Sequence, residues 1–139
     1  MPTFNVDEER INIFEISDTL LFSHYFDNRD LFKKLSEWYA DEQYRFEVPR
    51  DDYEKVEETL HEYYFDPVII DDPARFCAAL GQNSKYKEIL RNSVHHWSHG
   101  GRRYFIMKDQ LEVEKAVENG AEKADPGHVE IHTERPSHA

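Results

Sequence analysis

The sequence contains a single cysteine among its 139 residues. Cys77 alone cannot form a disulfide within the chain and cannot build a cysteine-based zinc site. No apolar run approaches the roughly 18 residues that a membrane-spanning helix needs, and the first residues lack the charged-then-apolar pattern of a secretory signal. We therefore expect a cytoplasmic protein that has no membrane contact, no metal ion and no other cofactor.

The sequence also lacks the short motifs of common catalytic and nucleotide-binding sites. It holds no HExxH zinc motif, no GxxxxGK[ST] phosphate loop and no GxGxxG dinucleotide loop. We therefore assign no catalytic residue, and a non-enzymatic function is favoured over an enzymatic one.

Basic residues are in the minority, with 17 Lys and Arg against 29 Asp and Glu and a net charge of −12. This balance favours solubility and disfavours broad binding to nucleic acid. Residues 85–108 have the opposite charge balance, with six basic residues and one glutamate. We call this stretch the basic segment, since a local basic surface in an acidic chain can still attract an anion.

The basic segment contains the candidate binding residues. We predict a helix up to Trp97, then a histidine-rich turn at Gly100–Gly101 and a strand over residues 102–107, because paired glycines allow a sharp turn. The candidate ligand-binding residues are Lys85, Lys87, Arg91, His95, His96, His99, Arg102 and Arg103.

Two further chemistries were weighed for these histidines. On a helix, His95 and His99 would lie one turn apart and present two imidazoles together, but the sequence pattern supplies no third ligand, so we predict no metal site. A metal-free ribonuclease would need a histidine base, such as His95 or His99, and an arginine to stabilise the phosphorane, such as Arg102 or Arg103. Tyr104 would be its second acid.

Hydrophobic periodicity predicts the elements of the first half of the chain. Residues 19–26 fit either a strand or a helix, and a strand that forms a hairpin across Ser17–Asp18 is favoured. The short apolar strand over 68–70 is expected to be central in its sheet and parallel to the strand over 44–48. The predicted strands are 11–16, 19–26, 44–48 and 68–70, and the predicted helices begin at the N-caps Asp27 and Asp51, with a hydrophobic staple between Phe26 and Leu31.

In the second half, Asp72–Pro73 predicts the start of a helix that ends at Gly81. A further helix is expected to begin at an N-cap, Ser84, and a last one at Asp109, with Gly120 as the residue that ends it. From Ala121 onward the sequence is polar and holds two prolines, which is typical of a flexible tail.

Together these elements predict an α+β (or α/β) fold over residues 1–120. We expect one domain, a two-layer sandwich in which a mixed sheet of about five strands packs with four to five helices. The predicted flexible polar tail covers residues 121–139.

Four stretches carry a resemblance to a known group of proteins. They read FEISDTLLFSHYF, YRFEVPRDDYEKVEETL, FDPVIIDDPARFC and ILRNSVHHW followed by RRYFIMKD. In them the chain resembles the small acidic, uncharacterised proteins of halophilic archaea, over about residues 1–120. The resemblance implies that the acidic surface is partly an adaptation to salt, and it implies no activity and no site residues.

The function favoured by the sequence is that of a small cytoplasmic binding or regulatory protein. We expect it to act through contacts with a protein partner or within a homodimer. Two alternatives remain open: binding of nucleic acid or of an anionic ligand through the basic segment, and a small histidine-dependent hydrolase or ribonuclease.

Overall fold

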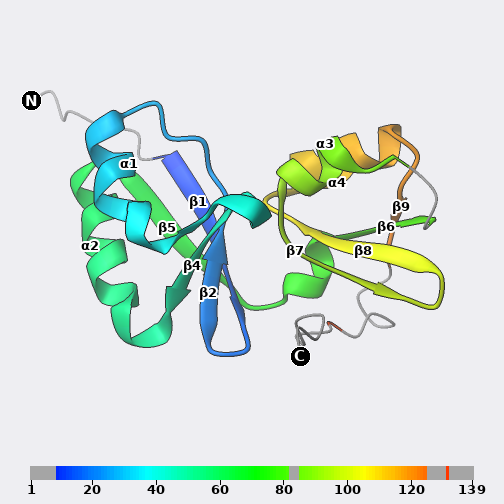
Figure 1. Ribbon diagram of the computed structural model, residues 1–139, viewed down its shortest axis with the longest axis horizontal. Coiled ribbons are helices and arrows are strands. Elements are labelled where there is room, and N and C mark those ends of the chain that lie inside the picture. Colours follow the sequence, from blue (N-terminus) through cyan, green and yellow to red (C-terminus); the bar gives the residue numbers. More distant parts are fainter. Residues whose placement is uncertain (1–8, 82–84, 125–130, 132–139) are drawn as a thin grey trace, which may run out of the picture.

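The computed structural model describes residues 9–81, 85–124 and 131, which form two β-sheets with two helices each (Figure 1). Sheet A holds β1 (Glu9–Ile16), β2 (Thr19–Phe22), β3 (Tyr39–Ala40), β4 (Arg45–Pro49) and β5 (Phe65–Ile70), in the order β3-β4-β2-β1-β5. Sheet B holds β6 (Cys77–Gly81), β7 (Ser93–His99), β8 (Arg102–Met107) and β9 (Glu122–Lys123), in the order β7-β8-β6-β9. The helices are α1 (Arg29–Leu35), α2 (Tyr53–Glu62), α3 (Lys87–Arg91) and α4 (Gln110–Glu118).

The predicted α+β class is confirmed, and so is the mixed sheet of five strands. Sheet B is a second sheet that the sequence did not predict. Its connectivity, β6-α3-β7-β8-α4-β9, is the β-α-β-β-α-β arrangement of ferredoxin-like units. Among the described residues, no helix is long and apolar enough to span a membrane.

Sheet A begins with the predicted hairpin. Ser17 and Asp18 connect β1 to β2, and both adopt positive φ angles of 54° and 62°, as the tight two-residue turns of hairpins require. Residues 19–22 are therefore a strand. The helices α1 and α2 pack on one face of the sheet, around a core that includes Ile13, Phe22, Leu31, Phe46, Val56 and Leu60.

Three predictions for sheet A were wrong. The N-cap of α1 is Asn28 rather than Asp27, because the Asn28 side-chain oxygen accepts hydrogen bonds from the backbone N–H groups of Asp30 and Leu31. This shift moves Phe26 and Leu31 out of the two positions of a staple, although both are buried in the core. The helix α2 begins at Tyr53, after a 3-10 turn that takes up Asp51.

The third error concerns β5, which lies at the edge of sheet A and not at its centre. It pairs in parallel with β1. The predicted direction is confirmed, because β4 and β5 point the same way, but β2 and β1 lie between them.

In sheet B, one predicted helix is a strand. Residues Cys77–Leu80 are all buried in β6, between β8 and β9. A short run that is apolar throughout fits a central strand and a buried helix equally well, so periodicity could not separate them. Burial also raises the pKa of the Cys77 thiol to about 12, which keeps it protonated and unreactive at neutral pH.

The helix predicted up to Trp97 is also mostly a strand. Only Lys87–Arg91 is helical, and the histidines lie in β7. The predicted N-cap, Ser84, lies outside the described residues. The turn at Gly100–Gly101 is confirmed, with φ angles of 60° and 78°, and so is the strand that follows it.

The end of sheet B overlaps the predicted tail. The helix α4 has the predicted N-cap, since the Asp109 carboxylate accepts from the Glu112 N–H, and Gly120 follows it with φ 103°. Ala121 is then buried, and β9 pairs with the middle of β6. The tail prediction was therefore wrong for residues 121–124. Residues 125–130 and 132–139 lie outside the described residues.

The two faces of sheet B have different partners. On one face α3 and α4 pack through Phe105, Met107 and Val113. On the other face, Trp97 and Ile106 join Phe14, Ile16 and Leu21 of sheet A in a shared core. The two sheets thus pack against each other, and the start of β4 comes close to β7.

Candidate functional site

The β7–β8 hairpin distributes the three histidines over two faces. Successive side chains of a strand point to opposite sides, so His95 and His99 share the face of Trp97, whereas His96 lies on the face of Phe105, its cross-strand neighbour. Four residues along a strand span roughly 13 Å. The predicted histidine pair of one helical turn therefore does not form, and no cluster of three metal-binding side chains occurs among the described residues.

The residues proposed for a ribonuclease are also divided between the two faces of the hairpin. His99 and Arg102 are cross-strand neighbours on one face, and Arg103 lies on the other. Tyr104 stacks on Trp97 at a centroid distance of 5.4 Å. His99, Arg102 and Tyr104 thus lie on one face of the hairpin, and Arg103 lies on the other.

His96 is held in its neutral form. Its Nε2 lies 3.1 Å from Oε1 of Gln43, and since an amide oxygen only accepts, the imidazole donates. Burial, helped by the positive charges of nearby His95, Arg45 and Arg103, lowers the pKa of His96 to about 4. At neutral pH this nitrogen carries a proton that it shares with Gln43, so it is not free to act as a base.

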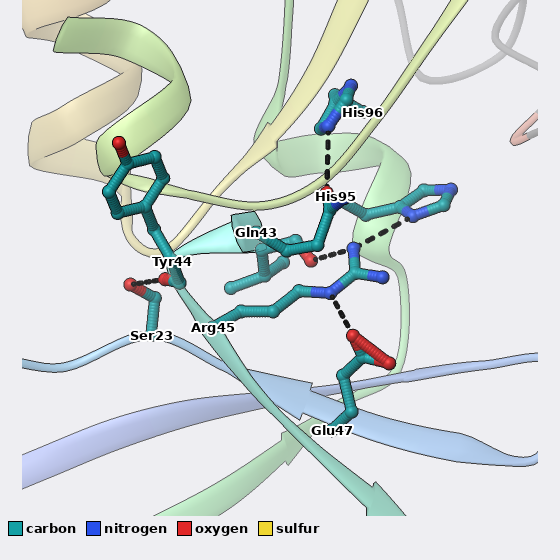
Figure 2. A network of polar contacts seen from close by, with 8 residues as sticks. Ser23, Gln43, Tyr44, Arg45, Glu47, His95 and His96 are labelled. Carbon is teal, nitrogen blue, oxygen red and sulfur yellow. Dashed lines mark hydrogen bonds and ion pairs between the residues drawn. The ribbon is translucent and has the colours of Figure 1, made fainter. Parts of the chain in front are cut away.

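A residue that sequence analysis missed connects the two sheets. Arg45 in β4 donates from Nη1 to the Val94 carbonyl at 2.8 Å and lies 3.4 Å from Nδ1 of His95 (Figure 2). Its Nε pairs with Glu47 at 3.2 Å, and the side chains of Arg45 and Glu47 are only 11% and 20% exposed. In the sequence, Arg45 and Glu47 alternate with apolar residues and so resemble the solvated side of a strand, which is why neither was singled out.

The basic residues of the segment fall into two groups. Arg91 and Arg102 are paired with carboxylates, Glu88 at 3.5 Å and Glu122 at 3.0 Å. Within the described residues, the remaining cations have no carboxylate at ion-pair distance. They are Lys85, Lys87, Arg103 and Lys108.

The sheets end in four edge strands, β3 and β5 in sheet A and β7 and β9 in sheet B. β3 and β9 are two residues long. β7 is longer, but it has an irregularity between Ser93 and His95, and Arg45 binds the Val94 carbonyl. Short length, bulges and charged side chains keep sheet edges from pairing with other chains. β5 has six residues and a single charge, Asp66.

On the outer side of β5, the backbone hydrogen-bonding groups are not paired with any residue that the structure describes. The Glu9 N–H of β1 donates to the Tyr64 carbonyl at 3.1 Å. Peptide groups alternate in direction along a strand, so the register with β1 leaves those of Phe65, Pro67 and Ile69 pointing outward. Pro67 has no N–H to offer. The outward edge therefore presents three carbonyls and the N–H groups of Phe65 and Ile69.

No protein-family model, curated protein or solved structure matched this chain. The candidate sites therefore rest on the geometry of the chain itself: the β5 edge in sheet A, and the unpaired cations near the start of α3 in sheet B.

Proposed function

We propose that this is a non-enzymatic binding protein that adds an extended segment of a partner protein to the outer edge of β5. The observation that carries this proposal is the contrast among the four sheet edges. Three are short, or blocked by a bulge and an arginine, whereas β5 is six residues long and is protected only by Asp66 and Pro67 among its own residues. Strand addition at a free edge is a common mode of peptide recognition.

The side chains around this edge define the chemistry of the partner. Ile69 is 46% exposed and Tyr64 59% exposed, so both can cover apolar side chains of an added strand. Asp66 and Asp71 are exposed within and just after β5. We therefore expect a partner segment that combines β-branched residues with lysine or arginine, because opposite charges steer association and fix its register.

A second copy of the chain fits this edge less well. Two copies would each carry a net charge of −12, and such a charge disfavours self-association. A basic partner segment gains from the same charge. The free edge and the charge around it thus favour a different protein over a homodimer.

The test uses a synthetic nine-residue peptide that alternates valine and lysine, titrated into labelled protein and followed by amide NMR shifts. The expected shifts centre on Phe65 and Ile69, and a matched peptide with glutamate in place of lysine binds at least about tenfold more weakly. The variant Ile69→Pro removes one outward N–H without touching the β1 ladder, so binding should be lost.

The control is Leu111→Lys. It changes another exposed apolar residue, which lies in α4, the helix that packs on sheet B. This control is expected to bind the peptide as the wild type does. Three results would overturn the proposal: no shift at β5, equal binding by Ile69→Pro, or a concentration-dependent doubling of mass that Ile69→Pro abolishes. The last would assign the edge to a second copy.

A further inference from the structure

Arg103 has an unusual environment for a cation. Its guanidinium carbon lies 4.4 Å from the centroid of the Tyr86 ring, a distance typical of a cation–π contact. Its Nε is buried and has no hydrogen-bond acceptor among the described residues. Buried donors are nearly always satisfied, so a cation whose buried donor has no acceptor among the described residues is a candidate for binding an anionic ligand.

Two lysines lie next to Tyr86, the residue that Arg103 contacts, in the sequence. Lys85 and Lys87 flank Tyr86 in the sequence, and both are exposed. The Tyr86 ring packs against the core of sheet B beneath Arg103. One positive charge therefore lies over this half-buried ring and two more flank it in the sequence, and no carboxylate of the described residues lies at ion-pair distance from any of the three. This local excess of positive charge occurs in a chain whose net charge is −12.

The neighbouring arginine shows the opposite arrangement. Arg102 points to the other face of β8, because adjacent strand residues alternate. There it pairs with Glu122 of β9 at 3.0 Å. The chain thus neutralises Arg102 and leaves Arg103, one residue further on, without a counterion among the described residues.

We propose that Arg103, with Lys85 and Lys87, binds a phosphate group. A guanidinium held in one plane by an aromatic ring offers parallel N–H donors that match two phosphate oxygens, and lysines add charge without geometric demand. This chemistry is shared by a nucleotide and by the backbone of a nucleic acid. The site lies in sheet B, apart from the β5 edge, so it stands or falls independently of the proposed function.

The experiment compares Arg103→Gln with Arg102→Gln. Both variants change the net charge by the same amount at adjacent positions, so they separate a specific site from a general loss of charge. Three probes are titrated: inorganic phosphate, a mononucleotide, and a single-stranded ten-residue oligonucleotide at several salt concentrations. We expect Arg103→Gln to weaken binding at least about tenfold, since charge-assisted hydrogen bonds to the phosphate are lost, and Arg102→Gln to change it less than about twofold.

The probes distinguish the two sources of phosphate. Binding of the oligonucleotide with a salt dependence that falls by about 0.7 in log–log slope in Arg103→Gln identifies a nucleic-acid backbone. Binding of the mononucleotide or of phosphate alone, lost in the same variant, identifies a small phosphorylated ligand. Both results support the proposal.

Two controls keep the test decisive if Arg103→Gln unfolds. Arg103→Lys keeps the charge but loses the planar donors, and should bind more weakly than the wild type. The double variant Lys85→Gln/Lys87→Gln alters only exposed side chains, so its fold is expected to persist while its affinity falls. The proposal is overturned if no probe binds, or if Arg102→Gln and Arg103→Gln weaken binding equally.

Discussion

The edge strands β5 and β7 are both protected against pairing with another chain, but by different residues. β7 is blocked by a residue from the other sheet, because Arg45 reaches across from β4 to the Val94 carbonyl. β5 is guarded by a residue of its own, Pro67, which lacks the N–H that an added strand would use. Protection of β7 therefore depends on the packing of the two sheets, whereas protection of β5 is local and partial. This difference is the reason that we propose β5, and not β7, as the edge that binds a partner.

The largest expected effect comes from breaking the protection of β7 with Arg45→Ala. This change removes the donor that binds the Val94 carbonyl and the cation that pairs with the mostly buried Glu47 side chain. We expect the free energy of unfolding to fall by about 3 kcal/mol, measured by urea denaturation. The control is Arg50→Ala, because the Arg50 side chain, which pairs with Glu15, is 61% exposed and the pair should contribute less than about 1 kcal/mol. Equal losses in the two variants would show that Arg45 is not a special link between the sheets.

The next effect comes from removing the protection of β5 with Pro67→Val. The new N–H points outward and completes the row of donors on this edge. Pairing of two copies would then gain one N–H per chain at about 1 kcal/mol each, so self-association should strengthen by roughly thirtyfold. Light scattering coupled to size-exclusion chromatography measures it. The control Pro49→Val, at the exposed end of β4, should remain like the wild type, and an unchanged mass for Pro67→Val would contradict the assigned direction of the peptide groups.

The smallest expected effect concerns the hydrogen bond between His96 of β7 and Gln43, which needs to be compared between neutral and protonated His96. The pKa of His96 in the folded protein, about 4, lies below its ordinary value of 6.5, so the unfolded chain takes up the proton first as the pH falls. The stability from neutral His96 is complete above pH 6.5 and is lost progressively toward pH 4. Comparison of unfolding in the wild type and His96→Gln isolates this loss from that of the carboxylates. We expect a difference on the order of 1 kcal/mol between pH 7 and pH 4.5, since the ring is partly exposed. Parallel stability curves for the two proteins would contradict it.

Parts of this fold follow from local chemistry and were predictable. The turn at Ser17–Asp18, the cap at Asp109 and the glycine pair at 100–101 each require only residues within one turn of the chain. The predicted class, α+β with a mixed five-stranded sheet, follows from the sum of such elements.

Other parts depend on distant contacts and were not predictable from one sequence. The run Cys77–Leu80 is a strand because β8 and β9 pair with both its sides, and residues 93–99 are a strand because β8 lies beside them. The candidate sites share this limit. The basic segment was recognised from its charge, but its division between Arg102 and Arg103 depends on Glu122 and Tyr86, and the role of Arg45 depends on β7.

The order of the strands along the chain also has a consequence for biosynthesis. Sheet A is complete within residues 9–70, whereas sheet B uses residues 77–123 and closes with β9. Domains tend to fold from the N-terminus as the ribosome releases them, so sheet A is expected to form first. Until β7 and β8 emerge, its face with Phe14, Ile16 and Leu21 has no cover from sheet B. A nascent chain from which sheet A has emerged but sheet B has not would therefore expose this apolar face to chaperones.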